Sequence, residues 1–112
     1  MKRHGSIIEI KEHRIAEYKK LHAAVWPEVL QMIKKCNIHN YSIYLRQLPD
    51  GKYYLFSYFE YSGSDFDGDM AKMAADQKTC EWWDVCKPCH QPFEDRRDDE
   101  WWAAAEEVFH CD

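Results

Sequence analysis

The elements expected along this sequence follow the order strand, helix, strand, strand, helix, strand. This order predicts an α+β fold of the split βαβ, or ferredoxin-like, type with an antiparallel sheet. Apolar residues alternate in the segments expected as strands and recur at helical spacing between the first two. Pro49-Asp50-Gly51 marks a tight turn between the second and third strands. The chain of 112 residues, 46% of them hydrophobic, is sufficient for one folded domain over residues 1–112.

The N-terminal half contains the clearest pattern. Residues 3–11 alternate as a strand, with Ile8 and Ile10 on one face. Residues 12–36 carry apolar side chains three, four and seven apart, which predicts a long helical stretch. Pro27 lacks a backbone N–H and suits the first turn of a helix, so we expect a kink or a restart there.

The middle of the chain predicts a hairpin followed by helices. Residues 39–47 and 52–61 are expected to be its two strands. Asp65 is a suitable N-cap for a helix that extends through residue 74, and another helical piece is expected over residues 77–86.

The C-terminal quarter gives weaker signals. Residues 87–99 contain two prolines and a dense run of charges, and we expect a loop there. Residues 100–105 fit either a helical turn or an extended segment. Residues 107–110 are expected to form the last strand.

The third strand is apolar on both faces. Tyr54, Phe56 and Tyr58 alternate with a second set of apolar side chains at Tyr53, Leu55, Phe59 and Tyr61. A sheet face in contact with water is expected to be polar, and helices in this fold cover one face only. We therefore expect a homodimer in which two sheets pack together as one α+β barrel.

Charge and hydropathy exclude two classes of partner. The net charge of −5 is unsuited to nucleic acid, which requires clustered Lys and Arg. No apolar run approaches the roughly 20 residues of a membrane span, and the N-terminus does not have the pattern of a secretory signal. A cytoplasmic protein without membrane contact is expected.

The cysteines include one pair with dithiol spacing, Cys86-Lys87-Pro88-Cys89. That pair lies late in the chain and after a Trp-rich segment, whereas a redox dithiol usually opens a helix after an early strand. A zinc site would require two further ligands, and the flanks contain no second paired motif. We expect incidental thiols and no metal.

Tyr18 and His22 are four residues apart, so they are neighbours on the helix face directed at the sheet. One interpretation is a core histidine bonded to Tyr18 or to a backbone carbonyl. Tyr41, Trp82 and Trp83 indicate a second interpretation, a cavity with one imidazole, phenol hydroxyls and flat indole faces. Sugars suit such a cavity, although composition alone permits other ligands.

Four segments carry a resemblance to a known family. The segment from Tyr18 to Glu28 resembles the Tyr-x-x-x-His-x-x-x-Trp-Pro-Glu motif of L-rhamnose mutarotases. Residues 39–45, His-Asn-Tyr-Ser-Ile-Tyr-Leu, are similar to the second-strand motif of that family. The Trp82-Trp83 pair and the terminal Glu107-Val108-Phe109 match in kind and order.

The resemblance implies a homodimeric enzyme that interconverts the α and β anomers of L-rhamnose or a related deoxy sugar without a cofactor. It implies that His22 is the acid/base residue and that Tyr18, Tyr41, Trp82 and Trp83 bind the sugar. It implies no role for the second indole pair, Trp101-Trp102, which we interpret as packing or a dimer contact.

Two other functions fit the same architecture. Haem-degrading enzymes and other small monooxygenases also use His and Trp in the pockets of dimeric ferredoxin-like barrels. A non-catalytic binding or assembly module would use the aromatic residues only for its core and interface. The fold alone does not choose among them.

Overall fold

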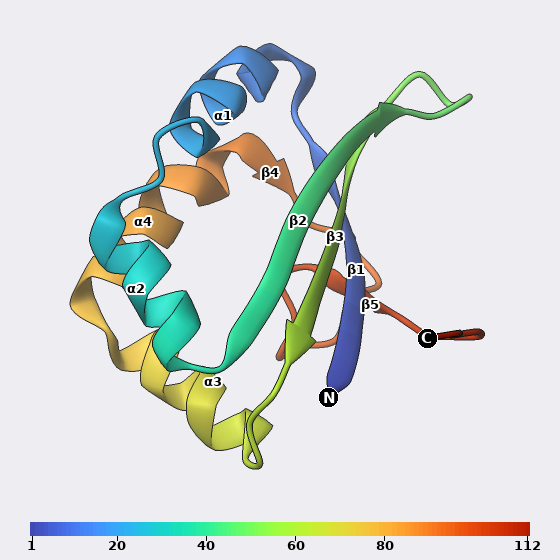
Figure 1. Cartoon of the computed structure of the whole chain (residues 1–112). Coiled ribbons are helices and arrows are strands. Elements are labelled where there is room, and N and C mark those ends of the chain that lie inside the picture. Colours follow the sequence, from blue (N-terminus) through green and yellow to red (C-terminus); the bar gives the residue numbers. More distant parts are fainter.

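A computed structural model describes all residues, 1–112, as helices packed on one face of a curved antiparallel sheet (Figure 1). The elements in chain order are β1 (Lys2–Ile10), a 3₁₀ turn (Glu12–Arg14), α1 (Ile15–His22), α2 (Pro27–Lys35), β2 (Ile38–Gln47), β3 (Tyr53–Tyr61), α3 (Phe66–Ala75), α4 (Gln77–Cys86), a second 3₁₀ turn (Lys87–Cys89), β4 (His90–Gln91) and β5 (Ala103–Ala105). The α+β class with an antiparallel sheet is therefore confirmed.

The sheet has the order β2-β3-β1-β4, and β5 also pairs with β1. β4 bonds to the end of β1 and β5 bonds to its middle, so both lie on the side of β1 that faces away from β3. The backbone N–H of Lys11 donates to the Cys89 carbonyl at 2.9 Å and continues this pairing beyond β1. The first strand is thus held on one side by segments from the end of the chain.

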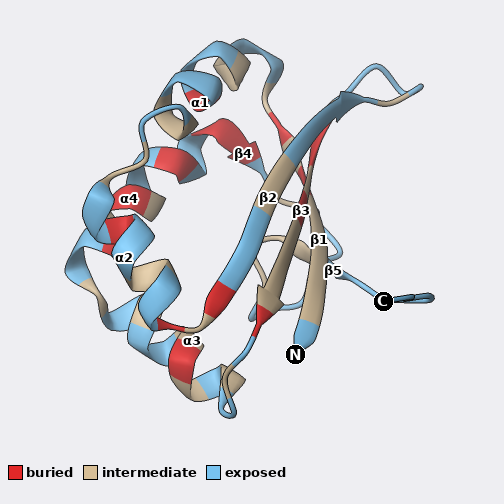
Figure 2. Ribbon diagram, in the orientation of Figure 1, coloured by how far each residue is buried: buried red, intermediate tan, exposed pale blue.

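The core lies between the sheet and the helices (Figure 2). Ile8 pairs across the sheet with Leu55, and both side chains point to the helices. They pack in one cluster with Val29 of α2 and Trp82 of α4. Burial of these large apolar groups is the main force that holds the helices on the sheet.

The expected restart at Pro27 is confirmed. α1 ends at His22, and α2 begins at Pro27, with Trp26 as its N-cap in an extended conformation. Proline stabilises a helix start, because the first N–H groups of a helix have no intrahelical partner. The break puts His22 at the free end of α1, beside α2 and α4.

A β-bulge interrupts the pairing of β2 with β3. His39 pairs with Glu60 and Ser42 pairs with Tyr58, so β2 has one more residue than β3 in this interval. Asn40 has a φ of 50°, a left-handed conformation that Asn tolerates better than most residues. The extra residue shifts the alternation by one position, so Ile38 before the bulge and Tyr41 after it can both face the helices.

The last strand is not where the sequence predicts it. Residues 106–112 form no strand, and Phe109 is 80% exposed, so the expected strand over residues 107–110 is wrong. The apolar Val108 and Phe109 imitate a strand pattern, but the chain offers them no partner strand. The sheet is completed instead by β5, and by β4 inside the expected loop of residues 87–99.

The outer sheet face is partly covered by the chain itself. Phe93, in the segment after β4, stacks on Tyr54 of β3 with ring centroids 6.1 Å apart. Tyr44 on the same face remains 65% exposed. No helix of the structure has the length and hydropathy required to cross a membrane.

Candidate active site

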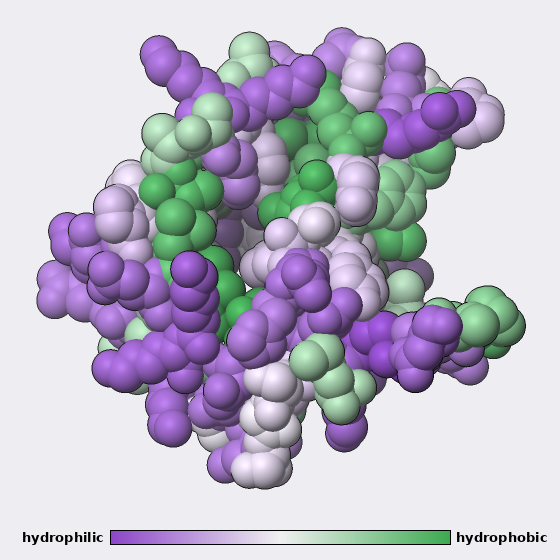
Figure 3. Space-filling model, in the orientation of Figure 1, coloured by the Kyte–Doolittle hydropathy of each residue, from purple (hydrophilic) through white to green (hydrophobic).

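A cavity of about 860 Å³ opens between the helices and the sheet. This volume lies within the range of about 300–1,000 Å³ typical of small-molecule sites. Figure 3 shows hydrophobic side chains along the hollow between the helices and the sheet. Most of the lining is apolar, and its polar members are His22, Lys34, His39, Asn40, Tyr41 and Thr79 together with the indoles of Trp82 and Trp83.

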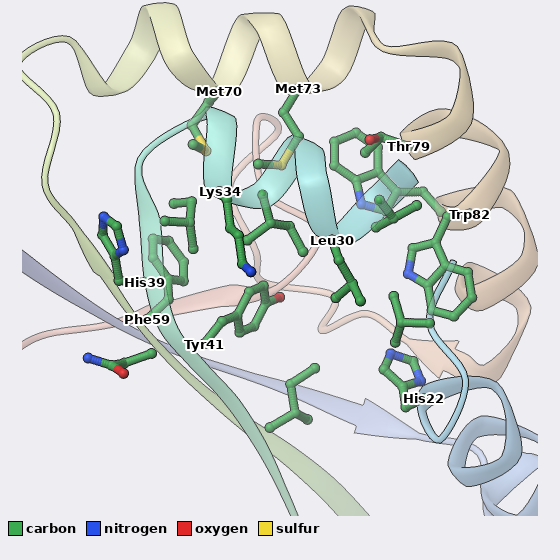
Figure 4. Close-up of a pocket in the computed structure, with 17 residues that line it drawn as sticks. His22, Leu30, Lys34, His39, Tyr41, Phe59, Met70, Met73, Thr79 and Trp82 are labelled. Carbon is green, nitrogen blue, oxygen red and sulfur yellow. The ribbon is translucent and has the colours of Figure 1, made fainter. Parts of the chain in front are cut away.

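His22 lies at one end of this cavity (Figure 4). Its Nδ1 lies 3.0 Å from the Tyr18 carbonyl oxygen. A carbonyl oxygen only accepts, so Nδ1 carries the hydrogen and donates it. In the neutral ring Nε2 is then an unprotonated acceptor, and no protein group bonds to it.

Burial lowers the pKa of His22, and the hydrogen bond to the Tyr18 carbonyl opposes part of that change. The ring is therefore neutral at pH 7 and can take a proton at Nε2. Both interpretations of His22 from the sequence hold in part, since the residue bonds to a backbone carbonyl and also lines a cavity.

Trp82 and Trp83 both line the cavity, although they are adjacent on α4. Trp82 is 6% exposed and meets the His22 ring at a centroid distance of 5.3 Å and an interplanar angle of 62°. Trp82 also meets the Trp26 ring, at a centroid distance of 5.2 Å and an interplanar angle of 69°. Trp83 is half-buried. The pair thus offers apolar ring surface on the helix side of the cavity.

Tyr41 lies across the cavity from α4, on β2, and its side chain projects inward (Figure 4). Desolvation raises its pKa, so its hydroxyl stays protonated and acts as a hydrogen-bond donor or acceptor. The bulge residue Asn40 lies next to it and donates to Glu60 Oε1 at 2.8 Å.

Tyr18 does not line the large cavity. It is buried beneath His22, with the two rings stacked at a centroid distance of 4.1 Å. Both residues border a smaller cavity of about 230 Å³ on the other side of His22. The Tyr18 hydroxyl lies 3.2 Å from Nε2 of His90.

Several residues near the site were not expected from the sequence. Lys34, exposed and without an ion pair, projects into the cavity from α2 (Figure 4). His39 lines the cavity, and its Nε2 lies 2.6 Å from the Ser62 hydroxyl. The sequence position of His39, two residues before Tyr41, could have suggested that it lies near the cavity. Nothing in the sequence sets Lys34 apart from the other charged residues on the solvent-facing side of its helix.

The paired cysteines pack in the core with Tyr18 and Trp82 and do not line the cavity. Cys86 and Cys89 are buried free thiols, and burial raises the pKa of Cys86 to about 12. Burial also raises the pKa of Cys89. Both remain protonated at pH 7, which makes them poor nucleophiles.

The cavity therefore combines a neutral imidazole with an accessible acceptor nitrogen, one projecting phenol and two indoles. An unprotonated Nε2 can remove a proton from a hydroxyl of a bound molecule, and the resulting imidazolium can return it. The indole and phenol rings can contact the C–H faces of a sugar. The arrangement is suited to proton transfer on a small polyhydroxylated ligand.

Comparison with known proteins gives a consistent result. A family model described as L-rhamnose mutarotase matches residues 3–111. An L-rhamnose mutarotase of Oceanobacillus iheyensis is 35% identical over 112 residues, which cover 100% of both chains. An L-rhamnose mutarotase of Bacillus subtilis is 34% identical over 89 residues, or 79% of each chain.

One solved structure supports the fold. A crystal structure of an L-rhamnose mutarotase from Formosa agariphila superposes with a TM-score of 0.75 at 23% identity and covers 100% of both chains. These relatives give no support to the haem-degrading or monooxygenase alternative. The chain belongs to the L-rhamnose mutarotase family, because the family model matches nearly all of the chain and the Oceanobacillus iheyensis relative is 35% identical over 112 residues.

Proposed function

We propose that this protein interconverts the α and β anomers of L-rhamnose or a related deoxy sugar, with His22 as the acid/base residue. One observation carries the proposal: the hydrogen bond from Nδ1 to the Tyr18 carbonyl leaves Nε2 of His22 as a bare acceptor beside a cavity of about 860 Å³. Tyr41, Trp82 and Trp83 would bind the sugar in that cavity, and Tyr18, which is stacked behind His22, would orient the imidazole. No cofactor is required for this reaction.

The proposed reaction begins with removal of the anomeric hydroxyl proton by Nε2 of His22. The bond between the anomeric carbon and the ring oxygen breaks, a carbonyl forms at the anomeric carbon, and the ring oxygen takes a proton from a tyrosine hydroxyl or a bound water. Rotation about the adjacent C–C bond exposes the other face of the carbonyl. Closure reverses the two proton transfers and gives the other anomer.

The low pKa of His22 supports its role as the initial base, since a protonated imidazole could not accept this proton. Positioned proton transfer of this kind contributes roughly 10²–10⁴-fold to a rate. The raised pKa of Tyr41 makes its phenol a weak acid, so it favours a hydrogen-bonding role for Tyr41 and a bound water as the proton donor to the ring oxygen.

The test is saturation-transfer NMR between the two anomeric protons of L-rhamnose, with and without protein. His22→Ala is expected to lower the catalysed exchange at least 100-fold while the fold, followed by circular dichroism, is kept. His13→Ala is the matched control, because His13 is exposed in the 3₁₀ turn before α1. Unchanged exchange by folded His22→Ala protein would refute the role of His22.

We further propose that residues 1–112 form one mutarotase domain that works as a cytoplasmic homodimer. The exposed Tyr44 on the outer sheet face supports an interface there, as do the exposed Val108 and Phe109. The five free cysteines support a reducing compartment. Sedimentation velocity tests the dimer: Tyr44→Lys is expected to shift the protein toward monomer, and a wild-type monomer at micromolar concentration contradicts it.

A further inference from the structure

His90 is a buried histidine with a protein partner at each ring nitrogen. It lies in β4 opposite Ile10 of β1 and is 6% exposed. Its Nδ1 accepts a hydrogen bond from the indole Nε1–H of Trp101 at 3.0 Å. Its Nε2 lies 3.2 Å from the Tyr18 hydroxyl oxygen.

The indole partner decides which nitrogen of His90 carries the proton. An indole N–H only donates, so Nδ1 of His90 must be the acceptor. In the neutral ring the hydrogen then lies on Nε2, which donates it to the Tyr18 hydroxyl oxygen. The direction of the whole chain of bonds is fixed, from Trp101 through His90 to Tyr18.

His90 is neutral at pH 7. Burial is the main cause that lowers its pKa to about 4, and His22, Lys11 and Lys87 contribute in the same direction. Lys87 also lies over the Trp101 ring at 5.1 Å, and the guanidinium of Arg96 lies 5.6 Å from that ring. These cations hold the indole in place by cation–π contacts.

Tyr18 connects this chain of bonds to His22. The phenol ring, held at its hydroxyl by His90, stacks on the imidazole of His22 at 4.1 Å. The backbone carbonyl of the same residue accepts from Nδ1 of His22. Tyr18 therefore contacts His22 through both its ring and its main chain.

We propose that His90 and Trp101 are positioning residues for the proposed base His22 and act on it through Tyr18. With the Trp101 N–H in place, His90 has one tautomer and donates from Nε2 to the Tyr18 hydroxyl oxygen. That bond anchors the phenol ring on which the His22 imidazole stacks, and so supports the position of His22 beside the cavity. This inference rests on the proposed function of His22. It gives a role to one member of the indole pair 101–102 that the sequence leaves without one.

The decisive variant is Trp101→Phe, which removes the N–H donor and keeps an aromatic ring. Without that donor, Nδ1 of His90 is free to carry the hydrogen and Nε2 can become the acceptor. Trp102→Phe is the matched control, because Trp102 meets the His90 ring edge at 5.4 Å without a hydrogen bond to it. Rates and KM for L-rhamnose are measured by anomer-exchange NMR.

We expect Trp101→Phe to lower kcat about three- to tenfold, the effect of one neutral hydrogen bond, with KM changed less than twofold. Trp102→Phe is expected to leave both within twofold. His90→Leu is expected to lower kcat at least as much as Trp101→Phe. His90→Gln is expected to recover most of the rate, since its amide offers one acceptor and one donor.

Two-bond ¹H–¹⁵N correlation spectra of histidine-labelled protein provide a readout that packing alone would not change. They should show His90 protonated at Nε2 in the wild type and in Trp102→Phe, and a changed tautomer in Trp101→Phe. Equal kcat in Trp101→Phe and the wild type, or the same His90 tautomer in both, overturns the inference.

The two proposals fail in different ways. Loss of exchange in His22→Ala together with an unaffected Trp101→Phe removes only the positioning role. Full exchange in His22→Ala removes the proposed base, and with it the reason for positioning that ring. If His90→Leu does not fold, Trp101→Phe and its spectrum still decide the question.

Discussion

The bulge in β2 predicts a measurable difference between two substitutions of Asn40. Asn40 has a φ of 50°, which costs an L-residue without a compensating side chain about 1–2 kcal/mol and costs glycine almost nothing. Both Asn40→Ala and Asn40→Gly lose the same hydrogen bond to Glu60. The difference between the two variants therefore isolates the strain of the backbone at this position.

Glycine has its own cost, because it gives the unfolded chain about 0.4–1 kcal/mol more conformational freedom to lose. The net expectation is that Asn40→Ala is less stable than Asn40→Gly by roughly 0.5–1 kcal/mol. With an unfolding entropy of about 2.1 cal/mol/K per residue, this difference lowers Tm by about 2–4 °C in a chain of this length.

Thermal unfolding followed by circular dichroism measures the difference, and urea midpoints check it at 25 °C. The bulge also aims Tyr41 into the cavity, so the more strained alanine variant is expected to show the larger rise in KM for L-rhamnose. An alanine variant as stable as the glycine variant would show that the left-handed backbone of Asn40 is not a constraint on this strand.

Three further outcomes follow from the burial of site residues. Because the pKa of His22 is lowered, the rate of anomer exchange is expected to stay constant as the pH falls past 6.5, the usual histidine pKa, and to decrease only at lower pH. NMR measurements of the exchange rate from pH 4.5 to 8 check this expectation. The pKa of His90 is about 4 in the folded protein against 6.5 in the unfolded chain, so its neutral form contributes stability fully above pH 6.5. That contribution, on the order of 3 kcal/mol, is lost as the pH falls toward 4. Urea titrations should show a flatter pH dependence of the unfolding free energy in His90→Gln than in the wild type. Trp82→Ala is expected to cost roughly 3–5 kcal/mol of stability as well as sugar affinity, whereas the half-buried Trp83→Ala costs less stability; calorimetry separates the two, and equal losses would contradict the difference in burial.

The N-terminal half could be predicted well because its signals are local. Alternation in β1 and β3, the turn before Lys52 and the helix restart at Pro27 depend on neighbouring residues, and the structure confirms each. The C-terminal strands could not be predicted in this way. Ala103–Ala105 has no alternation, and it becomes a strand only because β1 offers an unpaired side.

The candidate site shows the same division. His22, Tyr41, Trp82 and Trp83 come together at one cavity, as the sequence predicts, while Tyr18 lies behind His22. Spacing within α1 predicts that Tyr18 and His22 are neighbours, but it gives no information about what lies on the other side of Tyr18. His90 reaches Tyr18 from 72 positions away in the sequence, and Trp101 bonds to His90; only tertiary structure reveals these contacts.

The pairing of β1 with both β3 and the C-terminal strands has a consequence for folding. During synthesis β1 emerges before the other strands of the sheet, and one of its sides stays unpaired until residues 90–105 have left the ribosome. The hairpin of β2 and β3 can form locally within microseconds, whereas closure of the sheet requires long-range contacts that slow folding. A chain stalled after α4 would expose the free side of β1 as an aggregation-prone edge, even though α1 to α4, and His22 with them, had already been synthesised.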